Sequence, residues 1–149
     1  MFLKPSNGNY APCYNKKGSA MNSPQVPISW GELFDKITIL QIKLDNLTLK
    51  TALENVEQEL KKLQSILIQY CPKEMKAAQL ECELRQINQH LWDIEDKIRD
   101  KERTNSFGDE FIQLARSVYI KNDERSRIKR KINDMLGSEL VEEKSYAKY

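Results

Sequence analysis

The sequence predicts an all-α protein built from four helices. Two observations support this fold class: apolar residues recur three and four positions apart through most of the chain, and no segment alternates apolar and polar residues between turn signals as a strand would. The composition agrees, because 40% of the 149 residues are hydrophobic and 31% are charged, as in ordinary soluble domains. We expect two antiparallel hairpins, the second of them a long coiled-coil-like pair.

The chain divides into three parts by composition. Residues 1–27 are rich in Pro, Gly, Asn and Ser and show no period, which predicts a disordered N-terminal extension. The helical domain is expected over residues 28–138, followed by a charged C-terminal tail, residues 139–149, that either frays or docks. No apolar run has the length of a membrane helix, and the N-terminus lacks the apolar stretch of a secretory signal. We therefore expect a cytoplasmic protein.

The first helix is expected to begin at Trp30, because Ser29 and Glu32 have the spacing of a capping box. Apolar residues from Leu33 to Leu47 then occupy more than one face of the helix. A helix that is apolar on several sides must be covered on several sides. We therefore expect it to be the central helix of the fold.

A second helix is predicted after a short break at residues 48–51, where the regular helical spacing of the apolar residues is interrupted. Thr51 and Glu54 offer a capping box for it. Its apolar residues follow spacings of three and four, as heptads do. They are Leu53, Val56, Leu60, Leu63, Leu67 and Tyr70. Pro72 ends this helix and is expected to start the third, since proline suits the first helical turn.

The third helix is predicted to end in the turn at residues 105–108, and the fourth to stop at Gly137. Ser106 and Asp109 can cap the fourth helix.

The third and fourth helices are longer than the first two. Each has about 30 residues and reaches about 45 Å, whereas the first and second helices reach less than about 30 Å. The tip of this hairpin, around residues 92–120, should therefore project past the other helices and need a cover. The apolar stripes are Leu80, Leu84, Ile87, Leu91, Ile94 and Ile98, then Phe111, Leu114, Val118, Ile132 and Leu136.

Charged and aromatic residues flank the apolar stripes near this tip. Trp92, Glu95 and Arg99 recur three and four residues apart and can touch one another. Folding the hairpin places them level with Arg116 and Tyr119. The cluster is either a solvated ladder of ion pairs, each worth about 0 to 1 kcal/mol, or a site for a ligand or a partner.

Other polar residues lie within apolar faces. Arg125 interrupts the stripe of the fourth helix, with Asn122 and Lys129 on its edge. A buried charge is costly unless it is paired, so Arg125 either snorkels to water or meets an acid or an anionic ligand. In the first helix, Asp35 and Lys36 have apolar neighbours on nearly every side. They are either structural partners of a neighbouring helix or an acid and a cation beside a pocket.

Motifs for enzymatic chemistry are mostly absent. His90 is the only histidine, the three cysteines have neither disulfide nor zinc spacing, and no glycine-rich phosphate loop occurs. Glu32 with Asp35, and Asp93 with Asp96, could each offer two oxygens to Mg²⁺, but such pairs arise by chance in a chain this charged. No metal or cofactor is expected, and no catalytic residue can be assigned.

The charges also argue against nucleic acid as a partner. There are 24 basic and 22 acidic residues, and the net charge is +2. The basic run at residues 125–131 spreads over most of the circumference of a helix instead of forming one stripe. Neither nucleic acid nor a membrane is an expected partner.

Three long stretches, residues 31–43, 91–99 and 111–119, carry a resemblance that extends over about residues 28–149. Through them the chain resembles an uncharacterised family of small bacterial and phage proteins, known only as a domain of unknown function. The resemblance implies a helical fold and no established activity. Similar proteins occur beside glycosyltransferases and repeat proteins, which suggests a link to surface polysaccharides. The matching positions include Asp35, Lys36, Trp92, Glu95, Arg99, Arg116, Tyr119, Asn122 and Asp123.

Two functions from different classes fit the sequence. The first is a non-enzymatic interaction or assembly module, accessory to surface-polysaccharide or glycosyltransferase systems. In this hypothesis the chain forms a homodimer or binds a protein partner that covers the hairpin tip. The exposed aromatic residues expected at that tip are Trp92, Phe107, Phe111 and Tyr119.

The alternative is a helical enzyme or ligand-binding domain for a small phosphorylated or carboxylated metabolite. Arg99, Arg116 and Arg125 would grip the anion, and Glu95 would act as acid or base. Whether the protein is an enzyme stays open. The candidate binding residues are Asp35, Lys36, Trp92, Glu95, Arg99, Arg116, Tyr119, Asn122, Asp123 and Arg125.

Overall fold

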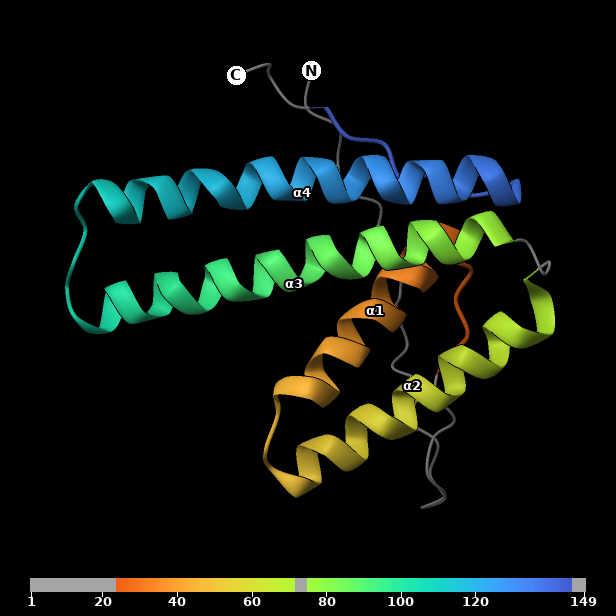
Figure 1. Cartoon of the computed structure of the whole chain (residues 1–149). Coiled ribbons are helices and arrows are strands. Elements are labelled where there is room, and N and C mark those ends of the chain that lie inside the picture. Colours follow the sequence, from red (N-terminus) through yellow and green to blue (C-terminus); the bar gives the residue numbers. More distant parts are fainter. Residues whose placement is uncertain (1–23, 72–74, 146–149) are drawn as a thin grey trace, which may run out of the picture.

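A computed structural model of the chain describes residues 24–71 and 75–145. Within these ranges the structure consists of four helices and no strand. They are α1 (Trp30–Asn46), α2 (Lys50–Tyr70), α3 (Met75–Arg103) and α4 (Asp109–Leu136). Helices α1 and α2 form one antiparallel hairpin, and the longer α3 and α4 form a second one that lies across it (Figure 1). The prediction of an all-α fold with a long α3/α4 pair is confirmed.

Helix α1 is the centre of the fold, as its apolar pattern predicted. It packs against each of the other three helices, whereas α2 packs against α1 alone among the described helices. One side of α1 forms an apolar cluster with α2. This cluster contains Leu33, Ile37, Leu40, Val56 and Leu60. The other side enters a second cluster through Phe34, which packs with Ala77, Leu84, Ile128 and Ile132 of α3 and α4.

Both ends of the helical domain carry the predicted stop and start signals. The Ser29 hydroxyl accepts a hydrogen bond from the backbone N–H of Glu32 at 3.2 Å, which caps α1. The carboxylate of Glu32 does not complete the capping box but pairs with Lys129 of α4. At the other end, Gly137 adopts the left-handed conformation with φ 61° and terminates α4.

The predicted caps of α2 and α4 are wrong. The N-cap of α2 is Leu49, two residues before the expected cap Thr51, because the N–H of Leu53 already bonds to the carbonyl of Leu49 at 3.0 Å. Helix α4 is preceded by Gly108, which has no side chain to act as a cap. The Ser106 hydroxyl instead accepts a hydrogen bond from the Thr104 hydroxyl at 3.1 Å within the turn.

Two further details of α2 differ from the prediction or lie beyond the structure. Tyr70 was expected in the apolar stripe, but its side chain is exposed, because the last turn of α2 has no helix over that side. The predicted start of α3 at Pro72 lies outside the described residues. Among the described helices none is both long enough and apolar enough to cross a membrane.

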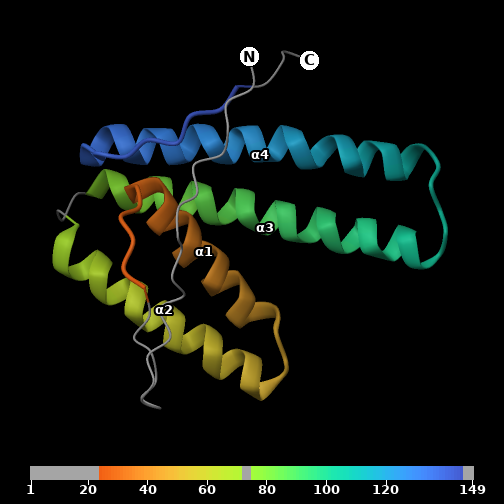
Figure 2. The ribbon, with the colours of Figure 1, turned by 180° about the vertical axis from the view of Figure 1, so that it is seen from behind.

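The α3/α4 hairpin projects past the rest of the molecule. Helices α3 and α4 contain 29 and 28 residues against 17 in α1. At about 1.5 Å per residue, α3 is therefore about 18 Å longer than α1. Figure 2 shows the same projection from behind: the turn between α3 and α4 lies well beyond the α1/α2 hairpin. The predicted mismatch in length is confirmed.

Helix α1 approaches the backbone of α4 closely at Gly31. The Gly31 N–H donates to Asn133 Oδ1 at 2.6 Å. A Cβ atom at this position would lie 2.7 Å from the carbonyl oxygen of Lys129, a backbone atom that cannot move aside on its own. Glycine is therefore required here for the helix contact and not for its backbone conformation.

We predict that Gly31→Ala destabilises the protein by about 2 kcal/mol, because overpacking at the helix contact outweighs the gain in helix propensity. The free energy of unfolding from chemical denaturation, followed by circular dichroism, measures this effect. Gly108→Ala is the matched control: no atom lies within 4 Å of its Cβ position. It should change stability by less than about 1 kcal/mol. Equal losses in the two variants would contradict the steric explanation.

Candidate functional site

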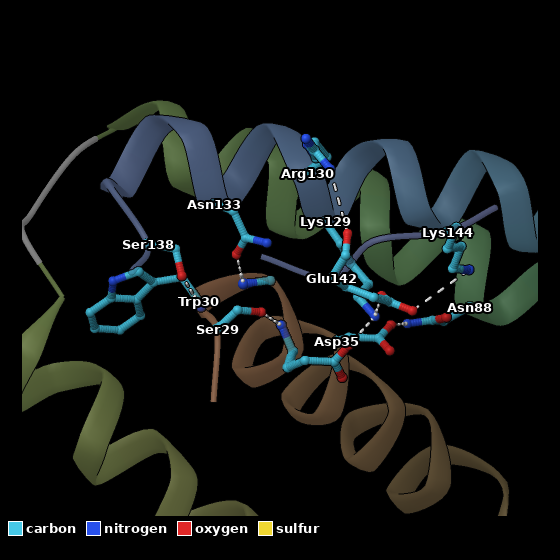
Figure 3. A network of polar contacts seen from close by, with 12 residues as sticks. Ser29, Trp30, Asp35, Asn88, Lys129, Arg130, Asn133, Ser138, Glu142 and Lys144 are labelled. Atoms are coloured by element: carbon cyan, nitrogen blue, oxygen red, sulfur yellow. Dashed lines mark hydrogen bonds and ion pairs between the residues drawn. The ribbon is translucent and has the colours of Figure 1, made fainter. Parts of the chain in front are cut away.

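Buried polar side chains gather where α1, α3 and α4 meet. The buried polar and charged residues of the described chain are Ser29, Asp35, Thr38, Asn88, Lys129 and Asn133. They come from three helices, yet most of them bond to one another or to the first turns of α1 (Figure 3). Such groups are costly to bury unless they are paired. The cluster is therefore the first place to look for a site.

Asp35, Thr38 and Asn88 form the α1/α3 half of the cluster. Asn88 Nδ2 donates to Asp35 Oδ1 at 2.8 Å and to the hydroxyl of Thr38 at 3.0 Å. The Thr38 hydroxyl donates in turn to the carbonyl oxygen of Asp35 at 2.9 Å. The other amide atom, Asn88 Oδ1, is buried and has no hydrogen-bond partner in the described structure. The Nδ2 amide group of Asn88 thus donates the hydrogen bond that holds the buried carboxylate of Asp35.

Lys129 forms the α4 half of the cluster. Its ammonium group pairs with the carboxylate of Glu32 in the first turn of α1 and with Glu142 Oε2 of the tail at 2.8 Å. Burial alone would lower the pKa of Lys129. The hydrogen bonds that Lys129 donates to Glu142 and Glu32, together with the negative charge of Asp35, outweigh burial and raise the pKa above its ordinary 10.5. Lys129 is therefore a fixed cation.

The C-terminal tail docks on the helices through this cation. The hydrogen bond from Lys129 lowers the pKa of Glu142 below its ordinary 4.5. Before that contact, the Ser138 hydroxyl accepts from the backbone N–H of Trp30 at 3.3 Å, which ties the end of α4 to the start of α1. Of the two predicted outcomes for the tail, docking is what the structure shows up to residue 145, while Tyr146 and Tyr149 lie outside the described residues.

Asp35 and Lys36 lie next to each other in sequence but meet different helices. Asp35 is buried against α3 through Asn88. Lys36 is half exposed and forms an ion pair with Glu59 Oε1 of α2 at 2.7 Å. Each thus has a structural partner on a neighbouring helix, which was one of the two interpretations of this pair.

The remaining candidate residues lie on the projecting part of α3 and α4. Arg99 Nη2 pairs with Glu95 Oε2 at 3.0 Å and Arg99 Nη1 with Asp96 Oδ1 at 3.3 Å, all three side chains being exposed. Trp92 is half-buried beside them. This is an ion-pair ladder within α3.

The candidates on α4 vary in exposure. Arg116 and Tyr119 are exposed, whereas Asp123 and Arg125 are half-buried. Asn122 Nδ2 donates to the carbonyl oxygen of Val118 at 2.9 Å. Nearer the turn between the two helices, Lys101 of α3 forms an ion pair with Glu110 of α4.

Helical periodicity places five of these residues in line with the residues that contact α1. On α3, Asn88 contacts α1, and Trp92, Glu95 and Arg99 follow it at spacings that keep them on the same side. On α4, Asn122 lies two turns before Lys129 and Tyr119 four turns before Asn133. We call Trp92, Glu95, Arg99, Tyr119 and Asn122 the tip face. It continues the surface that α1 covers in the body of the protein.

The apolar seam under the tip face is incompletely covered. Where α1 overlies α3 and α4, seam residues such as Leu84 and Ile132 are fully buried. Beyond α1 the seam residues are only half-buried; they are Ile94, Ile98, Phe111, Leu114 and Val118. Next to them Ile112 and Phe107 are about half exposed, and the Phe107 and Phe111 rings pack edge to face at 5.3 Å.

The acidic pairs considered for Mg²⁺ are engaged otherwise. Glu32 is bound to Lys129 and Asp35 to Asn88. Asp93 accepts a hydrogen bond from Gln89, and Asp96 one from Arg99. Within the described ranges there is no group of three or more His, Cys, Asp or Glu side chains that could hold a metal ion.

The protein is thus a small all-α protein in which the central helix α1 carries buried polar groups and packs against the longer α3/α4 hairpin. The chain belongs to a family described as a family of unknown function, DUF6165, which matches residues 24–149. This confirms the resemblance to a domain of unknown function. No match was found among curated proteins or among solved structures.

We predict that Asn88→Ala lowers the free energy of unfolding by about 2 kcal/mol, because the buried Asp35 carboxylate loses its donor. Thermal or chemical denaturation measures this loss. Gln89→Ala is the matched control, since Gln89 makes only an exposed contact with Asp93. It should change stability by less than about 0.5 kcal/mol. A loss in Asn88→Ala no larger than that of the control would show that this donor contributes nothing.

The contact between Lys129 and Glu142 predicts a stability window in pH. Because the folded pKa of Glu142 is lowered, its contribution is present above pH 4.5 and is lost as the pH falls through the folded value. Because the folded pKa of Lys129 is raised, its contribution is present below pH 10.5 and is lost as the pH rises through the folded value.

The unfolding free energies of the native chain and of Glu142→Gln, measured over a pH series, test this window. The native chain should be the more stable of the two between these limits, and the difference should shrink below pH 4.5. A difference independent of pH would contradict the assignment of this contact.

Proposed function

We propose that the protein is a helical assembly module that forms a homodimer through the tip face. One observation carries the proposal: the surface of α3 and α4 that α1 covers in the body continues, uncovered, to the end of the hairpin. A seam that is fully buried beneath α1 becomes half-buried beyond it. A pair of helices with an open seam is best stabilised by another layer of helix packed across it.

The composition of the tip face supports a second copy as this layer. A two-fold interface brings the same patch of both protomers together, so the patch must be complementary to itself. Within the tip face Glu95 supplies a negative and Arg99 a positive charge, and Asp123 and Arg116 lie near it on α4. Each protomer can therefore offer an acid to the other's arginine.

The aromatic residues supply the apolar part of the proposed contact. Trp92 is half-buried and Tyr119 is exposed, and both border the open seam. Trp, Tyr and Arg are the residues that most often dominate the binding energy of protein interfaces. We expect Trp92 and Tyr119 to contribute most of the dimer's stability, with the charged residues around them setting its geometry.

The setting of such a module follows from the resemblance alone. The resemblance suggests an association with glycosyltransferases, and on this ground we propose that the dimer serves as an accessory to surface-polysaccharide synthesis. In this setting the dimer would hold two copies of a partner enzyme in a fixed arrangement. Its own contribution would be assembly and not chemistry.

The molar mass of the full chain in solution, measured by light scattering and sedimentation across a concentration series, tests the dimer. We expect a mass that rises from monomer to dimer. Replacing both Trp92 and Tyr119 by Ala should weaken dimerisation by about tenfold or more, while helicity by circular dichroism stays nearly unchanged. The matched control is Tyr70→Ala, since Tyr70 is an exposed tyrosine on α2, away from the tip. A native chain that is monomeric throughout, or equal masses for both variants, would overturn the proposal.

A further inference from the structure

Two adjacent cations of α4 bind two adjacent acids of the tail. Lys129 Nζ lies 2.8 Å from Glu142 Oε2. Arg130 Nη1 donates to Glu143 Oε1 at 3.2 Å and to the main-chain carbonyl oxygen of Glu142 at 3.5 Å. Figure 3 shows Lys129 and Arg130 on α4 and the acidic tail residue Glu142 beside the ammonium group. The α4 helix thus recognises both side chains and the backbone of this acidic pair.

The tail exposes its apolar residues. Residues 139–145 are not helical, with a bend at Glu139, and Leu140 and Val141 are exposed. The Ser138 hydroxyl donates to the carbonyl oxygen of Leu140 at 2.7 Å, and Lys144 Nζ lies 3.9 Å from Glu142 Oε1, both contacts within the tail itself. Gly137, which is left-handed, separates the tail from α4. The acidic pair thus attaches the tail to α4 by polar contacts, and a segment that buries little apolar surface opens at low free-energy cost.

Detachment of the tail would leave a binding surface behind. Lys129 would keep Glu32 as a partner and so remain charged in its buried position. Arg130 would lose both of its tail contacts. The released surface would present an ammonium and a guanidinium group, side by side on a rigid helix, with no tail carboxylate to neutralise them.

We propose that Lys129 and Arg130 form a binding site for an acidic peptide segment of a partner protein, and that the chain's own tail occupies this site in the isolated protein. The mode of recognition favours a peptide over a small anion. The site contacts two consecutive carboxylates and the main-chain carbonyl group between them, an arrangement that a polypeptide supplies. The tail is then an intramolecular competitor that a partner must displace.

This site is independent of the proposed dimer. The tip face lies on the part of α3 and α4 beyond α1, whereas Lys129 contacts the first turn of α1 and Arg130 follows it in α4. Failure of either proposal leaves the other standing, since one is measured by molar mass and the other by peptide binding.

The experiment uses the full chain and a fluorescent peptide with the sequence of residues 138–145. In the full chain, Glu142→Gln together with Glu143→Gln removes the two tail charges and keeps the side-chain shapes. The peptide should bind this double variant about tenfold or more tightly than the native chain, because the tethered tail no longer competes at high effective concentration. Fluorescence anisotropy at low ionic strength measures both affinities.

Three controls make the result specific. A peptide with Gln at positions 142 and 143 should bind neither chain. Adding Arg130→Gln to the double variant should weaken binding of the native peptide by about fivefold or more, since two hydrogen bonds to the peptide are lost. Glu139→Gln in the full chain removes an exposed tail carboxylate for which no contact with Lys129 or Arg130 is seen, and should leave peptide binding at the native level. Absence of binding to the double variant, equal binding to both chains, or equal binding of the Gln peptide would overturn the proposal.

Discussion

The double burial of α1 is the constraint on which the rest of the structure depends. This helix of 17 residues separates two apolar clusters, one shared with α2 and one with α3 and α4. Because α2 packs on no other described helix, it is attached to the long hairpin mainly through α1. A helix covered on several sides cannot send all of its polar groups to water. Asp35 and Thr38 are therefore buried with it and must find partners on neighbouring helices.

The partners of α1 explain why the polar network has its particular composition. Close approach to α4 requires Gly31, and the backbone N–H that this approach buries is satisfied by Asn133. The same approach brings Glu32 to Lys129, whose ammonium then attracts a second carboxylate from the tail. Packing, hydrogen bonding and tail docking thus follow from one helix contact. The cluster stabilises the fold and holds the buried Lys129 ammonium where the tail carboxylate of Glu142 reaches it.

Periodicity in the sequence was enough to predict the all-α fold, the central position of α1 and the projecting tip, because burial on one or several faces leaves a regular spacing of apolar residues. It also pointed to Asp35, whose neighbours are apolar. It did not single out Asn88, and it placed Lys129 only on the edge of the apolar stripe of α4. The carboxylate partners of Lys129 lie 97 and 13 residues away, and no local pattern records contacts over such separations. The capping predictions for α2 and α4 failed for the opposite reason: local cap chemistry was present, but the packing and turn geometry set the helix ends elsewhere.

The two surfaces proposed for binding rest on different physics, and this separates their responses to conditions. The tip face borders an open apolar seam, and burial of apolar surface depends little on ionic strength. The site at Lys129 and Arg130 recognises carboxylates near solvent, and salt screens such contacts over about 10 Å at ordinary ionic strength. Lys129 is itself buried, so its part of the contact is screened less than that of the half-exposed Arg130. In the two proposals, one short chain assembles through one end and exchanges an acidic segment at the other, and neither event requires the other.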